Sequence, residues 1–364
     1  MLKIQEFIFG HKDWRALLAA APYNLKITED DGFVMFKYNQ IGSDFGQEIC
    51  QEARGLILDA RDNFKVVRMA YKKFFNLGES YAAHIDWSTA HATEKIDGSL
   101  MSVWYARDKW HLSTNGVIDA FKAPLANRDG TFGELFEKVC PLATFKDFDK
   151  KKCFTFELVS PYNTVVIPYE KTEIYLLSIR NMDTLEEYDY SYLENWAECN
   201  GFKLPRAYGD VDEQGGRAIV DGMEEGHEGI VVRDGNNNRV KVKTSLYVQL
   251  HHMAGNGILT PERAVQLVMD NEVEEFLAYF PHHREMVNRI KYSMGMFQIS
   301  CAAIEAEVNG LKEVISNRKD FAIWVKARVR DPYRTLYFWA YDGVLEERVK
   351  TITAKDFAKK FLKH

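Results

Sequence analysis

The sequence predicts an α+β protein in which a domain of antiparallel β-sheets with flanking helices, residues 1–253, precedes an all-helical domain, residues 254–364. A chain of 364 residues exceeds the usual size of one domain, so two domains are expected. The first part alternates short β-rich runs with turn residues. From Thr260 the apolar spacing becomes helical, beginning with Pro261 at the first helical position. The boundary is placed in the glycine-containing stretch 254–257.

The elements of the first domain follow from apolar runs bounded by turn residues. Strands are expected at 33–36, 55–59, 65–70, 93–105, 110–114, 153–159, 165–167, 173–179, 229–232 and 239–244. The turn at 234–238 predicts a hairpin between the last two of these strands. Apolar spacing predicts helical structure over 117–140 and a helix over 192–199 that ends at Asn200 and Gly201.

Composition and charge exclude several classes of protein. The five cysteines are widely spaced and never form a C-x-x-C pair, which argues against a disulfide framework or a zinc site and fits a reducing cytoplasm. The sequence suggests neither a signal peptide nor a membrane span. The net charge is −6, yet residues 311–364 carry 13 Lys/Arg against 7 Asp/Glu. This basic segment fits either a polyanion-binding surface or a solvated helix face.

The hexapeptide at residues 94–99, E-K-I-D-G-S, is the strongest chemical signal. Lys95 is a candidate nucleophile, because a lysine amine attacks phosphorus once burial or neighbouring cations favour its neutral form. Asp97 could accept hydrogen bonds from a ribose or orient the amine, and Gly98 permits close approach of the backbone. Taken alone, K-x-D-G also fits an exposed turn beside a solvated lysine.

Charged residues in further short elements suit phosphate chemistry. They are Arg54 in A-R-G-L, Lys73 in K-F-F-N, Glu157 in F-E-L-V, Glu228 in E-G-I-V-V, and Lys241 and Lys243 in V-K-V-K. On a strand, the last two lysines point to one face, where they can bind a phosphate chain. Each element alone also fits a solvated strand charge, but their joint occurrence in this order argues against coincidence.

These motifs resemble those of the covalent nucleotidyltransferases, and most closely the RNA ligase 1 family of T-even-type bacteriophages. The resemblance covers roughly residues 30–250, and Tyr247, four residues past Lys243, is part of it. The chain departs from the family at Asn115, where a basic residue commonly precedes the glycine. The contact of that cation must be weaker here or come from another residue.

The resemblance implies an ATP-dependent RNA ligase that joins 5′-phosphate and 3′-hydroxyl RNA ends, with broken tRNA as a possible substrate. Lys95 would attack the α-phosphorus of ATP, AMP would pass to the RNA 5′-phosphate, and a 3′-hydroxyl would then displace AMP. Lys241, Lys243, Lys73 and Arg54 would contact phosphates, and Glu157 the ribose. Glu228 would hold Mg²⁺ or Mn²⁺, and Tyr247 would act in RNA ligation. A monomer in the cytoplasm of an infected or host cell is expected.

Several assignments stay open at this level. Tyr38 or Tyr175 could stack on the adenine or simply pack. Asp270 and Glu272 could add a metal site or lie on a solvated helix face. The basic and aromatic stretch 326–341 fits either RNA binding or a core helix with a basic face. An ATP-dependent DNA ligase or a GTP-using capping enzyme shares the motifs but usually carries an OB-fold after them, and a non-enzymatic RNA-binding protein would not need them.

Overall fold

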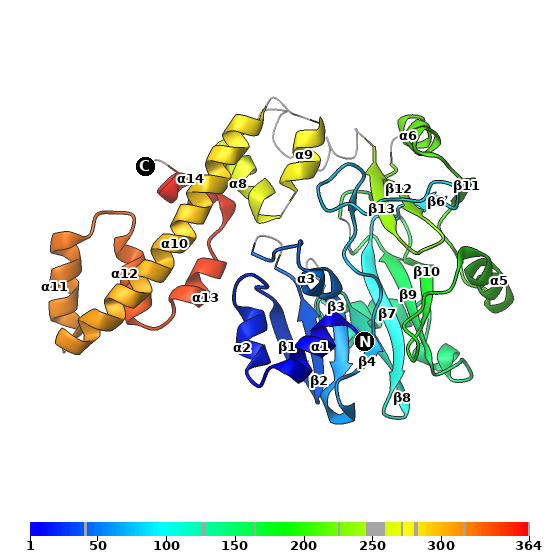
Figure 1. The fold of residues 1–364 in the computed structure, drawn as a ribbon, viewed down its shortest axis with the longest axis horizontal. Coiled ribbons are helices and arrows are strands. Elements are labelled where there is room, and N and C mark those ends of the chain that lie inside the picture. Colours follow the sequence, from blue (N-terminus) through cyan, green and yellow to red (C-terminus); the bar gives the residue numbers. More distant parts are fainter. Residues whose placement is uncertain are drawn as a thin grey trace. The chain divides into compact units, whose positions relative to one another are not determined.

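The computed structural model forms two compact units, residues 1–251 and 252–364 (Figure 1). It describes residues 1–39, 42–125, 129–163, 165–224, 226–244, 259–270, 272–279, 283–315 and 317–362. The first unit combines β-sheets with helices, and the described part of the second contains helices alone. The predicted α+β fold class is therefore confirmed, as is the helical character of the C-terminal part.

The described strands of the first unit form three sheets. The first is antiparallel, in the order β1 (Lys26–Asp30), β2 (Phe33–Lys37), β3 (Arg54–Asp59), β4 (Lys65–Arg68). The second is antiparallel, in the order β10 (Glu173–Asn181), β9 (Lys152–Val159), β7 (Ser99–Ala106), β8 (Lys109–Thr114). The third has the order β11 (Ala207–Asp210), β6 (His91–Glu94), β12 (Gly229–Arg233), β13 (Arg239–Lys243), β5 (Phe75–Asn76), with only the β13–β5 pair parallel.

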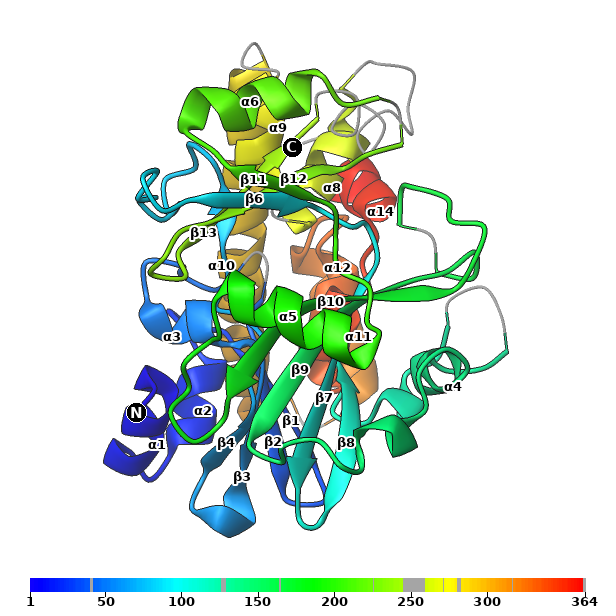
Figure 2. The ribbon, with the colours of Figure 1, turned by 90° about the vertical axis from the view of Figure 1, so that its right-hand side faces the viewer.

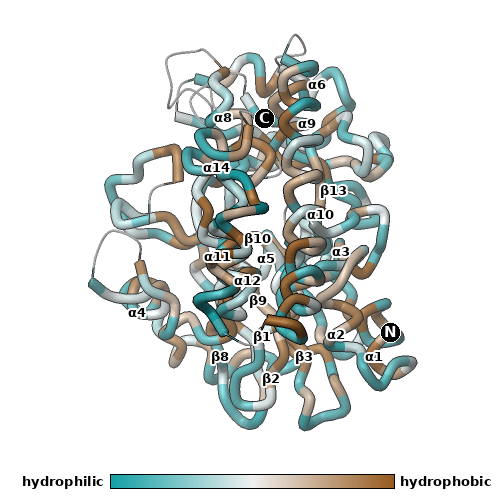
Figure 3. The backbone as a smooth tube through the Cα atoms, turned by 90° about the vertical axis from the view of Figure 1, so that its left-hand side faces the viewer, coloured by the Kyte–Doolittle hydropathy of each residue, from teal (hydrophilic) through white to brown (hydrophobic). Residues whose placement is uncertain are grey.

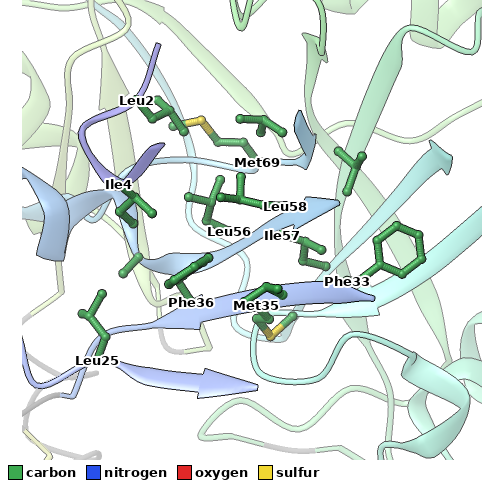
Figure 4. Close-up of a cluster of buried hydrophobic side chains, with 14 of the residues drawn as sticks. Leu2, Ile4, Leu25, Phe33, Met35, Phe36, Leu56, Ile57, Leu58 and Met69 are labelled. Atoms are coloured by element: carbon green, nitrogen blue, oxygen red, sulfur yellow. The ribbon is translucent and has the colours of Figure 1, made fainter. Parts of the chain in front are cut away.

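The first sheet is covered on both faces, which explains why the residues 33–36 of β2 and 56–58 of β3 are continuously apolar (Figure 4). Successive strand residues point to opposite faces. Phe36 accordingly packs on Trp14 of helix α2, with ring centroids 5.7 Å apart, whereas Phe33 packs on Trp104 of the second sheet at 5.0 Å. The helices on the outer face are α1 (Lys3–Gly10), α2 (Trp14–Ala19) and α3 (Glu48–Glu52).

The other two sheets carry helices on their outer faces (Figure 2). The second sheet packs with α4 (Phe132–Glu137), α5 (Tyr190–Asn200) and the short 3₁₀ segments Ala120–Lys122 and Leu142–Phe145 around an aromatic core. Helix α6 (Glu213–Asp221) covers the third sheet around Ile230, Val232 and Val240. A third 3₁₀ segment, Ala60–Asp62, connects β3 to β4.

The second unit packs around its long helix, α10 (Arg284–Val314). The others are α8 (Pro261–Met269), α9 (Val273–Tyr279), α11 (Arg318–Arg328), α12 (Arg334–Tyr341), α13 (Leu345–Lys350) and α14 (Ala354–Phe361). Hydrophilic and hydrophobic residues alternate along these helices (Figure 3), and the apolar ones form a separate core. Tyr333, Tyr337 and Trp339 pack on this core, which favours the core interpretation of the stretch 326–341.

Several expected elements differ from the observed ones. Among the described residues, the helical pattern over 117–140 yields only the segment Ala120–Lys122 and helix α4, because Pro124 and Thr131 form an antiparallel bridge and Thr131 then caps α4. Residues 165–167 form no strand, and the backbone N–H groups of Val166 and Ile167 donate to the Asp97 side chain instead. Helices α1 to α3 and the charged strand β1 were not predicted. No helix in the described ranges is long and apolar enough to span a membrane.

Candidate active site

The third sheet brings Lys95 against Glu228. The β6–β12 register pairs Glu94 with Ile230, and the Lys95 backbone N–H donates to the Gly229 carbonyl oxygen at 2.8 Å. Lys95 directly follows β6 and Glu228 directly precedes β12, so the two residues lie at the same end of these neighbouring strands. Lys95 Nζ donates to Glu228 Oε2 at 2.6 Å, and the Glu228 side chain is only 3% exposed.

Lys243 completes a cation–carboxylate–cation arrangement. The β12–β13 hairpin pairs Gly229 with Lys243, which puts Lys243 Nζ 3.5 Å from Glu228 Oε1. One buried carboxylate thus lies between two ammonium groups, and the trio keeps a net positive charge for a phosphate. Lys241 lies two residues earlier on the same strand, opposite Val231, so the two lysines share a face as predicted.

Asp97 fastens the segment next to Lys95. Its buried carboxylate oxygen Oδ2 accepts the backbone N–H groups of Val166 and Ile167, each at 2.8 Å. Its own backbone N–H donates to the Tyr169 hydroxyl at 3.3 Å. These bonds explain why residues 165–167 do not form the expected strand. A direct contact of Asp97 with a ribose stays a prediction.

Gly98 permits close packing of the nucleophile loop on strand β9. A Cβ atom at this position would lie 2.5 Å from the Leu158 carbonyl oxygen and 3.1 Å from Glu157 Cγ. Any side chain would push the loop away from the strand that carries Glu157. Close approach was predicted for Gly98, but its partner here is the protein's own backbone.

Glu157 lies in the middle of the second sheet, between Leu100 of β7 and Tyr175 of β10. Burial raises the pKa of Glu157 to about 7, although the charge of Lys95 opposes this shift. Its carboxyl group therefore changes protonation near neutral pH. Tyr175 donates its hydroxyl to Glu173 at 3.0 Å.

Lys73 is surrounded by aromatic rings. Its ammonium nitrogen lies 4.8 Å from the ring centroid of Tyr38, 4.7 Å from that of Phe45 and 5.1 Å from that of Phe75. Burial of Tyr38 opposes ionisation, but the charges of Lys73 and Arg54 outweigh it and lower the tyrosine pKa. Tyr38 is thus buried beside cations, and adenine stacking on it stays a prediction.

Arg54 lies at the start of β3, and its guanidinium group can donate a further hydrogen bond. Its guanidinium lies 5.1 Å from the ring centroid of Phe74, and its buried Nη1 has no hydrogen-bond partner. Sequence reasoning missed the residue that holds its backbone, Arg68. Fully buried, Arg68 donates from Nη1 to the carbonyl oxygens of Arg54, at 3.2 Å, and Gly55, and from Nε to Ser102 Oγ at 3.0 Å. Burial lowers the pKa of Arg68 to about 10.

Asp270 and Glu272 belong to the second unit, whereas this cluster is built from strands of the first. Asp270 ends helix α8 and accepts from Gln266 Nε2 at 2.8 Å, and Glu272 follows in the same unit, before α9. Tyr247 lies outside the described residues. Within the described ranges, no three His, Cys, Asp or Glu side chains are grouped to hold a metal ion. Mg²⁺ commonly combines one or two carboxylates with substrate phosphates and water, and Glu228 offers such a carboxylate.

Comparisons with known proteins agree with the motifs. A family model described as RNA ligase, of the T4 RNA ligase 1 type, matches residues 52–247. The RNA ligase of Rhodothermus phage RM378 is 26% identical, with 87% of this chain and 86% of that protein covered. A putative bifunctional polynucleotide kinase/RNA ligase of Autographa californica nuclear polyhedrosis virus is 30% identical over 71% of this chain, which spans only 39% of that protein.

Solved structures agree on the fold. An archaeal ATP-dependent RNA ligase superposes with a TM-score of 0.51 at 14% identity, with 84% of this chain and 83% of that one covered. At that identity the likeness concerns the fold alone. The family model, by contrast, covers more than half of the chain and confirms the family and the enzyme class that the motifs predicted. The chain therefore belongs to the T4-type RNA ligase family.

Proposed function

We propose that this chain is an ATP-dependent RNA ligase that joins a 5′-phosphate to a 3′-hydroxyl through lysyl-AMP and RNA-adenylate. The observation that carries the proposal is the buried contact of Lys95 with Glu228, with Lys243 on the other side of the carboxylate. It gives a member of this family a positioned amine, a carboxylate acceptor for its proton, and a cation for the phosphate.

The three transfers would use the same pocket. In the first, Lys95 Nζ bonds to the α-phosphorus of ATP as the bond to pyrophosphate breaks. An oxygen of the RNA 5′-phosphate then bonds to the α-phosphorus as the bond from that phosphorus to Lys95 Nζ breaks. Finally, the 3′-hydroxyl oxygen bonds to the phosphorus of the RNA 5′-phosphate as AMP leaves. Lys241 and Lys243 would neutralise the α-phosphate, and Arg54 and Lys73 the other phosphates. Most of the catalysis would come from position and charge.

Glu157 and Glu228 would bind different parts of the substrate complex, the ribose and the metal ion. Ionised above about pH 7, Glu157 would accept a hydrogen bond from the ribose. Glu228 would hold Mg²⁺ or Mn²⁺ when ATP is present, and that ion would shield the charge of the phosphates. Asp270 and Glu272 remain proposed contributors to a metal site, since each is a carboxylate near the start of the helical unit.

RNA placement is proposed for the helical unit. Residues 311–364 carry an excess of six positive charges, and the motifs of the proposed chemistry all lie earlier in the sequence. The names of the phage and baculoviral relatives support RNA as the substrate class. Cleaved tRNA as the natural substrate, and a cytoplasmic monomer as the working form, belong to the same proposal.

The test offers ATP or GTP to the full chain, and then an RNA or DNA strand with a 5′-phosphate and a 3′-hydroxyl. The expected result is transfer of AMP to protein from ATP and sealing of RNA, with Lys95→Ala inactive in both. Preference for GTP would instead assign the capping class, and preference for DNA ends would assign a DNA ligase.

A further inference from the structure

Lys37 is a cation that the sequence motifs do not include. It ends strand β2, and the register places it directly opposite Arg54 of β3. The pairing is irregular at this point because Gly55 forms a bulge at φ +71°, which brings Arg54 rather than Gly55 opposite Lys37. Like charges directly opposite on adjacent strands destabilise a sheet, so the pair calls for an explanation.

No acidic side chain of the described residues pairs with Lys37. Within the described residues, its half-buried side chain forms no ion pair and no hydrogen bond. By strand alternation it shares a face with Phe33, which packs on the second sheet. Its ammonium therefore lies over the second sheet rather than in open solvent.

The turn that follows β8 lies between Lys37 and the bulge. A Cβ atom on Gly116 would lie 3.3 Å from Lys37 Nζ, so the ammonium rests against this glycine. On the other side, a Cβ atom on Gly55 would lie 2.9 Å from Asn115 Oδ1. The amide oxygen of Asn115 and Arg54 Nη1 are both buried without a hydrogen-bond partner.

The charges of Lys37 and Arg54 act on residues of the candidate active site. The charges of Lys73, Arg54 and Lys37 act together on Tyr38 and overcome the effect of its burial on the pKa. The charge of Arg54 also acts on Glu157, as does that of Lys95. Two cations that pair with no acidic side chain of the described part of the chain, beside buried unpaired polar atoms and next to the proposed nucleophile, are suited to an anion.

We propose that Lys37 and Arg54 together bind a phosphate of the reacting substrates, with Lys37 supplying from β2 the cation that the family pattern would place at Asn115. The proposal rests on the proposed ligase function. The phosphate has two possible sources of the same chemistry, the pyrophosphate part of ATP and the 5′-phosphate of the RNA. Separate assays of the steps distinguish them.

The test compares full-length Lys37→Met, which keeps the aliphatic stem, with wild type in three single-turnover assays. These are self-adenylation by ATP, AMP transfer from purified lysyl-AMP protein to a 5′-phosphate RNA, and sealing of a pre-adenylated RNA. We expect a loss of about tenfold or more in the first or second assay, as for a lost charge-assisted hydrogen bond. The affected assay identifies the phosphate, and sealing of pre-adenylated RNA should change less than threefold.

A relocated charge provides the decisive control. Lys37→Met combined with Asn115→Lys returns a cation to the turn from the other side and should recover most of the lost rate. Lys65→Ala removes an exposed lysine at the far end of the same sheet, opposite Asp59, and should change no assay. Unchanged rates in the first two assays, an equal loss in all three, or failure of the relocated lysine to rescue would each overturn the proposal. Absence of lysyl-AMP in the wild type would instead refute the proposed function.

Discussion

Glu187→Gln tests what holds the third sheet against the second. The Glu187 carboxylate is fully buried and meets three arginines from three strands. Arg180 Nη2 of β10 lies 2.9 Å from it, Arg233 Nη1 of β12 lies 3.6 Å from it, and Arg239 of β13 donates a short hydrogen bond. Strands β12 and β13 lead to Glu228 and carry the two site lysines, so this cluster supports the candidate active site.

The expected loss of stability is about 3–5 kcal/mol, the range for removing one charge of a buried ion pair. Glutamine keeps the shape and one acceptor oxygen but leaves three buried guanidinium groups without a counter-charge. For a unit of this size, 1 kcal/mol corresponds to about 2–4 °C in Tm, so the Tm for unfolding of the first unit should fall by roughly 10 °C. Calorimetry or urea unfolding of the full chain at pH 7 measures it.

The difference in stability between wild type and Glu187→Gln should depend on pH. Burial opposes ionisation of Glu187, but the charges of Arg239, Arg233 and Arg180 outweigh it and hold the pKa below the ordinary 4.5. A depressed carboxyl pKa contributes stability above the unfolded value, and this contribution is lost as pH falls through the folded value. The difference between wild type and variant should therefore be full at pH 7 and shrink below about pH 4.5.

A matched control separates the cluster from the removal of any glutamate. Glu213 pairs with Arg217 at 3.0 Å on the exposed surface of α6, and Glu213→Gln should cost less than about 0.5 kcal/mol. A loss below about 1 kcal/mol for Glu187→Gln would refute the inference that its charge stabilises the three buried arginines.

Three further predictions concern the active site. Lys241→Ala and Lys243→Ala should each block adenylation while the fold survives, and wild-type adenylation rates would contradict the assignment of the lysine pair. Adenylation by wild type should rise through about pH 7 as Glu157 ionises, and a single-turnover pH profile of Glu157→Gln should lack that inflection. A chain ending near residue 255 should still form lysyl-AMP but lose its preference for structured RNA. Its RNA affinity should also depend less on salt concentration. Equal loss of adenylation and sealing would show instead that the helical unit helps to build the nucleotide site.

Local signals were sufficient for much of the first unit. The hairpin of residues 229–244 follows from its turn residues, and strand alternation places Lys241 and Lys243 on one face. The helix ending at Gly201 follows from the left-handed conformation that a glycine adopts easily, here φ +72°. These features depend on neighbours within a few residues, which is why one sequence was enough to predict them.

Long-range contacts account for what sequence reasoning missed. Asp97 accepts from backbone groups about 70 residues away, so nothing near the hexapeptide indicates that it fastens a loop. In the sequence, Lys37 resembles any charged residue at the end of a strand. Only the fold shows that the bulge at Gly55 places Arg54 opposite it. The apolar spacing over 117–140 suits a helix locally, but the Pro124–Thr131 pairing overrides it.

The most direct test of the central claim is peptide mapping after incubation of the full chain with ATP and magnesium in the absence of RNA. Lys95 should be the residue that carries AMP, through an acid-labile bond to Nζ. Lys95→Ala should remain unlabelled, and so should Lys95→Arg, because a guanidinium stays protonated at any working pH. AMP on another residue, or undiminished labelling of Lys95→Ala, would contradict the assignment of Lys95 as the nucleophile.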